Sequence, residues 1–250
     1  VQDELVATPH VMKTKEMIKI DVLDGGYVIN HPDGEMGNDL TIVNSARVSY
    51  QKRSESITED DMKLINFLAR EGHTSPFRHA TMQFETRVPL MIARQWYKYC
   101  VGAGFQDAMF GWNESSRRYI TERNEYHMPD YFREAPENSK QGSGPPVSDA
   151  LNEKWLNILA AHQLQGESLY QQAMADGICA EQARLFPSAY GLYVSFYWTA
   201  SVQAIAHLIV QRSKSDAQME FQFYADAVDR IARQHFPLSI EALIKHKAVG

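Results

Sequence analysis

The longest apolar stretch of the chain, Leu192–Val210, restricts the possible folds more than any other feature of the sequence. It is long enough to cross a bilayer, but hydroxyl, amide and imidazole side chains interrupt it, and such groups are costly inside a membrane. We therefore expect no membrane span. The stretch predicts a helix over residues 191–212 that is buried in a protein core.

Polar side chains recur at every fourth position of this stretch and end beside an arginine. Steps of four advance about 40° per turn of a helix, so these side chains would form a slowly winding polar stripe on an apolar rod. A solvent-exposed face is one interpretation of the stripe. The other is the wall of a ligand-binding groove, which the lack of lysine and glutamate in the stripe favours. The residues concerned are Ser195, Thr199, Gln203, His207 and Gln211, followed by Arg212.

Strand patterns precede helical patterns along the chain. Residues 81–89 alternate between apolar and polar side chains, which predicts a strand with Met82, Phe84 and Thr86 on one face. Residues 16–30 predict one or two further strands around an Asp-Gly-Gly turn.

Helical patterns dominate after a polar segment near residues 134–148, which we expect to be a variable linker within a single catalytic domain over residues 1–250. An earlier helix begins at Thr58, which can cap it together with Asp61, and another begins at Pro89. These patterns indicate an α+β fold, in which a small mixed or antiparallel sheet in the N-terminal half packs against a mainly helical C-terminal half. The later helices are expected over 149–176, 180–185, 216–234 and 239–249.

Composition excludes several classes of function. The net charge of −6 argues against a nucleic-acid-binding protein. The only cysteines, Cys100 and Cys179, provide neither a disulfide framework nor a cysteine zinc site. We expect no metal site, because His73 and His79 lie six residues apart across a proline loop. The sequence has no recognisable secretory signal, so a cytoplasmic location is expected.

The motif NESSRRY, Asn113–Tyr119, concentrates hydrogen-bonding groups in consecutive positions. Consecutive residues cannot all share one face of a helix or strand. A loop could present their backbone N–H groups, hydroxyls and a guanidinium to an oxyanion. The alternative is a helix cap followed by surface arginines. The nearby motif ARQW, residues 93–96, and the arginine-tipped polar stripe favour phosphate recognition.

Four motifs in the same order resemble the flavin-dependent thymidylate synthase family: EGHTSPFRH, ARQW, NESSRRY and QRSKSDAQMEFQ. The resemblance extends from about Ser45 to Leu243. The family's usual Arg-His-Arg triplet, followed by seven residues and a serine, corresponds here to Lys98-Tyr99-Cys100, with fifteen residues before Ser116. An insertion of about eight residues, near 102–110, accounts for the longer spacing. Asp216 stands where family members often have histidine.

The resemblance implies an FAD-dependent enzyme that methylates dUMP to dTMP, with methylenetetrahydrofolate as carbon donor and NADPH as reductant. It also implies a homotetramer with shared active sites. Arg212 would be the catalytic cation beside the N3–C4=O4 edge of uracil, and Arg118 and Arg184 would bind the phosphate. The implied substrate-binding residues are Gln95, Lys98, Glu114, Ser115, Ser116, Arg117, Arg118, Arg184 and Arg212. The implied FAD-binding residues are His73, Ser75, Lys98, Tyr99, Cys100, Glu114, Ser201, Gln203 and His207.

Two alternatives stay open at the level of the sequence. The altered loop could accommodate a 2′-hydroxyl, which would make the protein a UMP C5-methylase of nucleoside biosynthesis. The changed triplet could instead indicate a nucleotide-binding homologue with impaired catalysis. Lys98 keeps one charge and Tyr99 keeps a ring that can stack on flavin, but Cys100 keeps neither the charge nor the fork of an arginine.

Overall fold

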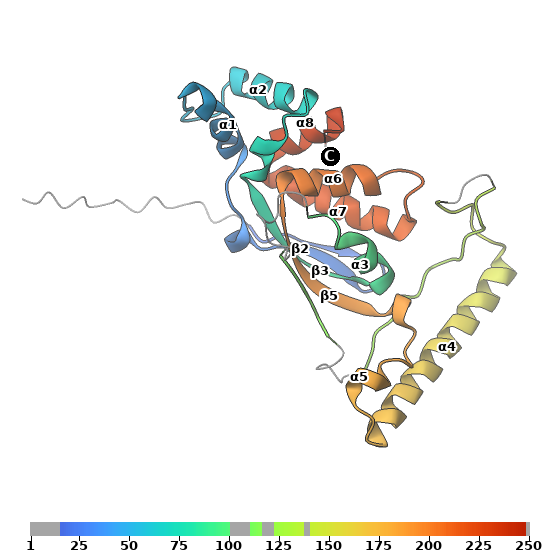
Figure 1. Cartoon of the computed structure of the whole chain (residues 1–250). Helices are drawn as coiled ribbons and strands as arrows, with labels where there is room; N and C mark the ends of the chain where they lie inside the picture. Colours follow the sequence, from blue (N-terminus) through green and yellow to red (C-terminus); the bar gives the residue numbers. More distant parts are fainter. Residues whose placement is uncertain (1–15, 101–110, 117–122, 138–140, 249–250) are drawn as a thin grey trace, which may run out of the picture.

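The computed structural model describes residues 16–100, 111–116, 123–137 and 141–248. Its centre is an antiparallel sheet with the strand order β1-β2-β3-β5-β4 (Figure 1). This confirms the α+β class and the antiparallel alternative. The strands are β1 (Lys19–Val22), β2 (Gly26–Asn30), β3 (Thr81–Pro89), β4 (Trp112–Glu114) and β5 (Tyr193–Ser201).

Strand β5 corrects the expectation of a helix over residues 191–212. The first part of the apolar stretch is a strand that lies between β3 and β4, so the sheet is not confined to the N-terminal half. Aromatic and β-branched side chains fill this part, and these residue types prefer the pleated surface of a strand. The side chains of β5 that face the core are Val194, Phe196, Trp198 and Ala200.

Only the second part of the stretch is helical, as α6 (Val202–Arg212). The helix starts where the strand ends, because the Ser201 side chain accepts a hydrogen bond from the backbone N–H of Ala204 at 3.1 Å. The expected polar stripe is therefore divided between two elements. Ser195 and Thr199 belong to β5, whereas the remaining members belong to α6.

The other helices agree with the sequence patterns except for α1 (Asp39–Arg47), which was not expected. The predicted capping box is present at the start of α2 (Glu59–Arg70). The Thr58 side chain accepts from the backbone N–H of Asp61, and the Asp61 carboxylate accepts from the backbone N–H of Thr58. The remaining helices are α2 (Glu59–Arg70), α3 (Leu90–Trp96), α4 (Asp149–Ala175), α5 (Ala180–Ala183), α7 (Met219–His235) and α8 (Pro237–His246). Short 3-10 helices are η1 (Pro32–Gly34), η2 (Val48–Tyr50), η3 (Ser75–Arg78) and η4 (Ala189–Gly191).

The core lies between the sheet and α6 and α7, with α8, α1 and α2 packed beyond them (Figure 1). Trp96, the last residue of α3, is fully buried near its centre. Its ring stacks on Phe221 at 5.4 Å and meets Trp198 edge-on at 5.5 Å. These contacts attach α3 to both the sheet and α7, and so fix the position of the side chains on the last turn of α3.

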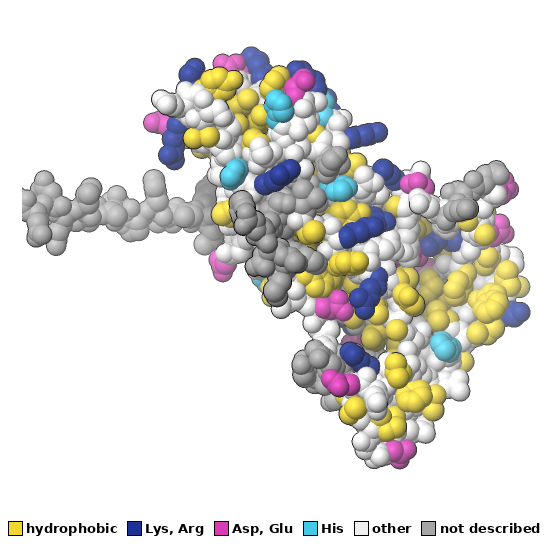
Figure 2. Space-filling model, viewed as in Figure 1, with side chains coloured by type: hydrophobic (Ala, Val, Ile, Leu, Met, Phe, Trp, Pro, Cys, Tyr) yellow, Lys and Arg dark blue, Asp and Glu magenta, His cyan; other side chains and the backbone are white. Residues whose placement is uncertain are grey.

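Helices α4 and α5 form an arm that extends away from the sheet (Figure 1). The buried residues of α4 all lie in its second half, and apolar side chains gather on the surface of the arm (Figure 2). The expected linker before α4 folds back on itself, since the backbone N–H of Glu134 donates to the carbonyl of Pro145 at 2.9 Å. No helix in the described ranges is long and apolar enough to cross a bilayer.

Candidate active site

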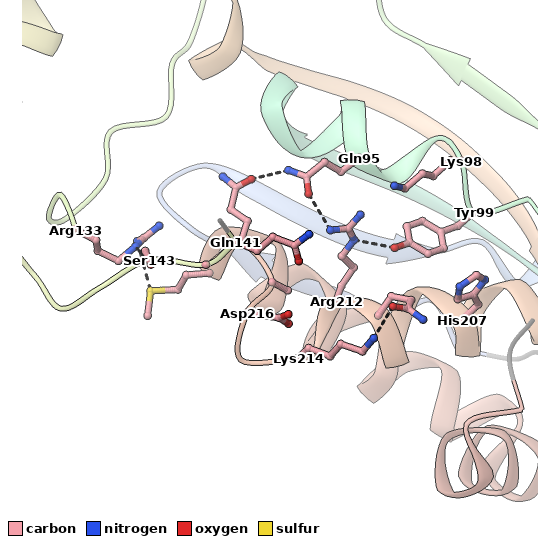
Figure 3. A pocket seen from close by; sticks show the side chains of 15 residues that line it. Gln95, Lys98, Tyr99, Arg133, Gln141, Ser143, His207, Arg212, Lys214 and Asp216 are labelled. Atoms are coloured by element: carbon pink, nitrogen blue, oxygen red, sulfur yellow. Dashed lines mark hydrogen bonds between the residues drawn. The ribbon is translucent and has the colours of Figure 1, made fainter. Parts of the chain in front are cut away.

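A pocket of about 890 Å³ lies at the C-terminal end of α6, between α3, the α6–α7 connection and the loop around residue 142 (Figure 3). Its walls carry several cations, amides and rings. The lining residues are Gln95, Lys98, Tyr99, Arg133, Gln141, Gly142, Ser143, His207, Gln211, Arg212, Lys214, Asp216, Ala217, Gln218 and Met219.

Arg212, the predicted catalytic residue, is held by neighbours on two elements. Its Nε donates to the Tyr99 hydroxyl at 2.8 Å, and its Nη1 donates to Oε1 of Gln95 at 2.9 Å (Figure 3). The guanidinium also lies 4.9 Å from the centre of the Phe221 ring. Among the described residues, none hydrogen-bonds to Nη2, so its N–H groups remain available for a ligand.

Tyr99 and His207 meet edge to face beside Arg212, with ring centres 5.3 Å apart. Burial raises the pKa of Tyr99 above its ordinary value, although Arg212 acts in the opposite direction. The Tyr99 hydroxyl is therefore protonated at neutral pH. Burial lowers the pKa of His207, and the positive charges of Lys214 and Lys98 lower it further, so this imidazole is neutral in the same range.

The structure thus brings together part of the predicted site: Gln95, Lys98, Tyr99, His207 and Arg212 all line one pocket. They come from α3, the residues just after it, and α6, which are remote in sequence. Cys100, the third member of the changed triplet, is half-buried next to the pocket and is not among its lining residues.

Other predicted FAD-binding residues lie at the opposite end of α6. His73, between α2 and η3, and Ser75, the first residue of η3, are exposed. Arg78 of η3 donates to Oε1 of Gln203 at 2.7 Å. Gln203 and the capping residue Ser201 are buried. Their contacts are those of a packed helix start, and their assignment to the cofactor stays a prediction.

In the described part of NESSRRY, Asn113 and Glu114 belong to the edge strand β4, and Ser115 and Ser116 follow it without regular secondary structure. Glu114 pairs with Phe196 in the β4–β5 ladder, and the Ser115 side chain accepts a hydrogen bond from the backbone N–H of Ser195 at 3.1 Å. Ser116 follows this pairing. Arg117, Arg118 and the insertion near 102–110 lie outside the described residues.

Arg184, the second expected phosphate ligand, is not at this pocket. It follows α5 on the arm, where it is exposed and its Nε donates to the carbonyl of Glu181 at 3.2 Å. One copy of the chain therefore does not gather all the predicted nucleotide ligands in one place.

Some lining residues were missed by the sequence analysis. Gln218 and Lys214 lie within the motif QRSKSDAQMEFQ, so the motif itself contained a signal for them. Ser143 belongs to the expected linker, and Arg133, whose guanidinium Nε donates to the Ser143 hydroxyl at 2.8 Å, directly precedes this linker. Nothing in the local pattern of the linker indicated a place in a pocket wall.

Comparison with known proteins identifies the family. The family model described as thymidylate synthase complementing protein matches residues 32–238. The chain is 32% identical over 233 residues to a flavin-dependent thymidylate synthase of Thermus thermophilus, covering 93% of this chain and 81% of that protein. It is also 32% identical over 233 residues to the flavin-dependent thymidylate synthase of Thermotoga neapolitana, covering 93% and 97% of the two chains.

The fold has a solved counterpart as well. The crystal structure of the UMP/dUMP methylase PolB from Streptomyces cacaoi, bound with 5-Br dUMP, matches with a TM-score of 0.77 at 22% identity, covering 92% of this chain and 99% of that chain. The expected family and enzyme class are confirmed by these matches. The chain belongs to the thymidylate synthase complementing protein family, whose relatives above are flavin-dependent thymidylate synthases.

Proposed function

We propose that this protein methylates C5 of dUMP to give dTMP, with methylenetetrahydrofolate as carbon donor and FAD, reduced by NADPH, as hydride source. The observation that carries the proposal is the position of Arg212. Tyr99 and Gln95 hold its guanidinium at the pocket while donors remain for a ligand. A fixed cation beside the N3–C4=O4 edge of uracil stabilises the negative charge that develops as C5 attacks the carbon donor.

The residues around the pocket fit a flavin nucleotide. The buried Nδ1 of His207 has no hydrogen-bond partner among the described residues, and the ring of Tyr99 lies beside it. Lys98 and Lys214 supply positive charge for phosphate groups. When bound, FAD supplies the hydride. Lys98, Tyr99 and His207 would hold it, and the neutral imidazole would exchange hydrogen bonds with it without adding charge.

A tetramer with shared sites would bring the missing phosphate ligand to the pocket. Arg184 lies on the arm, and the arm exposes an apolar stripe along α4 that includes Leu151, Trp155 and Ile158. An exposed apolar surface of this kind usually marks an interface. In this proposal, the arm packs on a second copy and delivers Arg184 to that copy's pocket. Helix α6 is buried in its own chain, so the exposed surface of the arm is the interface that we propose.

The test is purification followed by cofactor and turnover assays. The protein should be yellow or take up FAD, and dUMP should accelerate its oxidation of NADPH. With methylenetetrahydrofolate present, the product should be dTMP. A colourless protein that ignores FAD at micromolar concentration would refute the proposal.

The substrate UMP is a second candidate because the structural counterpart from Streptomyces cacaoi is a UMP/dUMP methylase. A site built around one sugar should discriminate by more than about tenfold, so turnover with dUMP and with UMP decides between them. Binding of dUMP without flavin reduction by NADPH would instead indicate a nucleotide-binding homologue with impaired catalysis.

A further inference from the structure

The amide of Gln95 has one possible orientation in this pocket. Arg212 can only donate hydrogen bonds, so Oε1 of Gln95 faces its Nη1 at 2.9 Å. The backbone carbonyl of Met91 can only accept, so Nε2 of Gln95 faces it at 3.2 Å. The second lone pair of Gln95 Oε1 and the unused N–H groups of Arg212 therefore provide an acceptor beside a donor at the pocket wall.

Gln218, the residue that precedes α7, completes the clamp on this amide. Its Oε1 accepts from Nε2 of Gln95 at 2.6 Å, and its own Nε2 contacts the sulfur of Met91 at 3.3 Å. Both N–H groups of Gln95 are thus engaged. Rotation of the Gln95 amide would break its contacts with Arg212, Met91 and Gln218 at once, so the acceptor stays on the side of the guanidinium.

We propose that Gln218, acting through Gln95, sets the preference of this site for uracil over cytosine. This inference rests on the proposed function, which puts a uridylate in the pocket. Uracil presents an N3–H donor next to the O4 acceptor, which complements the acceptor of Gln95 and the donor of Arg212. Cytosine in the same pose presents an N3 acceptor next to an N4 donor, and both groups would face like groups. Mispaired polar groups in a closed site are a strong source of discrimination.

Gln218 is a positioning residue in this scheme, so its removal should change nucleotide preference more than it changes the fold. Gln218→Met keeps the length of the side chain but removes the acceptor for Gln95. In the FAD-loaded protein, the dissociation constants of dUMP and dCMP are measured by calorimetric titration. The ratio of the dCMP constant to the dUMP constant, which measures the preference for uracil, should fall at least about tenfold. Gln218→Glu keeps an acceptor for Gln95 and should retain most of the preference.

Gln222→Met is the matched control, because Gln222 lies one turn along α7, donates to the backbone carbonyl of Ala217 at 2.8 Å and does not line the pocket. It should leave the ratio unchanged. In a Gln95→Met background, Gln218→Met should narrow the ratio no further, since it acts only through Gln95.

Two results would overturn this inference without touching the proposed function. One is a Gln218→Met protein with the wild-type ratio. The other is a fall in the ratio on Gln218→Met that is as large in the Gln95→Met background as in the wild type. In either case, wild-type binding and methylation of dUMP would remain. A wild-type protein that binds neither nucleotide would overturn this inference together with the proposed function.

Discussion

Arg212 ends α6, and a cation at this position has two possible roles. As a C-terminal cation it would interact favourably with the helix dipole by about 0.3–1 kcal/mol. As a preorganised donor to the substrate it would contribute a factor of about 10²–10³ in rate. Its contacts with Tyr99, Gln95 and Phe221 favour the second role, because they orient the guanidinium toward the pocket and not toward the last carbonyls of the helix.

Arg212→Lys separates the two roles. Lysine keeps the charge but loses the planar fork that lets arginine contact several groups at once. We expect a folded tetramer that binds FAD and whose methylation rate falls at least about a hundredfold, measured as dTMP formed at saturating substrates. Arg230→Lys, on the exposed face of α7, is the control and should keep full activity. If Arg212→Lys keeps most of its activity while Arg118→Lys does not, Arg212 is a structural cation only.

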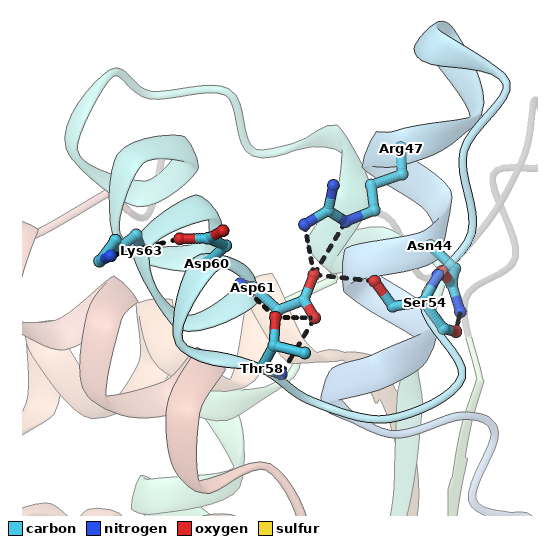
Figure 4. A network of polar contacts seen from close by, with 7 residues as sticks. All are labelled: Asn44, Arg47, Ser54, Thr58, Asp60, Asp61 and Lys63. Carbon is cyan, nitrogen blue, oxygen red and sulfur yellow. Dashed lines mark hydrogen bonds and ion pairs between the residues drawn. The ribbon is translucent and has the colours of Figure 1, made fainter.

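Asp61 shows a carboxylate used for structure alone (Figure 4). Its side chain is fully buried and contacts the guanidinium of Arg47 at 2.6 Å and the hydroxyl of Ser54 at 2.9 Å. Burial alone would raise its pKa, but the hydrogen bonds from Thr58, Arg47 and Ser54 lower the pKa to about 2. The network joins α1, α2 and the connection between them into one unit.

Asp61→Asn should therefore destabilise the fold by about 3 kcal/mol, because it leaves Arg47 without its anion. Since the folded pKa is lowered, the stabilising effect of Asp61 is complete above its ordinary value of 3.8 and is lost as the pH falls toward about 2. Urea unfolding of both proteins should show a difference in stability that is constant at neutral pH and shrinks below pH 4. Asp60→Asn, on the exposed neighbour, should change little. An equal loss for both variants would contradict this account.

At the scale of elements, the sequence predicted α2 and β3 because each carries a local signal. The capping residues define the start of α2, and Met82, Phe84 and Thr86 are fully buried as the alternation of β3 requires. The β5–α6 segment was misassigned for a physical reason. A spacing of four residues is compatible with a strand and with a helix. Residues four apart lie on the same face of a strand, and they also lie on nearly the same face of a helix. The polar pattern could not separate the two, whereas the aromatic content could have.

The packing of α4 against the segment that follows α5 depends on one glycine. A Cβ on Gly166 would lie 2.7 Å from the backbone oxygen of Phe186, two residues beyond Arg184. Gly166→Ala should gain about 1 kcal/mol of helix propensity but cost about 1–3 kcal/mol through overpacking. We expect a lower melting temperature and, because Arg184 is displaced, a KM for dUMP at least about tenfold higher.

Gln165→Ala, at the exposed neighbouring position of α4, is the control for this substitution and should change neither quantity. A Gly166→Ala protein that is more stable than the wild type and has an unchanged KM would show that the contact with Phe186 relaxes without moving Arg184.

At the scale of the whole molecule, the site could be predicted only in pieces. The motifs indicated Gln95, Tyr99 and Arg212, and the fold brings them together because Trp96 anchors α3 in the core. The separation of Arg184 from this pocket depends on where the arm lies, and no local pattern encodes that. An arrangement that involves a second copy of the chain is likewise invisible to periodicity and capping rules.

The proposed interface can be tested by placing charge on the arm. Trp155 and Ile158 are 46% and 45% exposed and lie on one face of α4. Trp155→Glu combined with Ile158→Glu should dissociate the proposed tetramer, because buried carboxylates would lack partners. It should also abolish methylation, because the proposed delivery of Arg184 to the neighbouring pocket would be lost. Light scattering after gel filtration measures the mass. Asn157→Glu, exposed on the same helix, should remain tetrameric. A fully active double variant of unchanged mass would rule out this interface.

The pairing of β3 with β5 has a consequence for folding during synthesis on the ribosome. The ladder joins Pro89 to Tyr193 and Thr81 to Ser201. The central strand pair of the sheet therefore cannot form until the last quarter of the chain has been synthesised. At ordinary translation speeds, the delay between synthesis of the two strands is on the order of ten seconds. Throughout that time one edge of β3 has no partner strand, and unpaired edges promote association between chains. We therefore expect nascent chains of this protein to associate most readily before β5 has emerged.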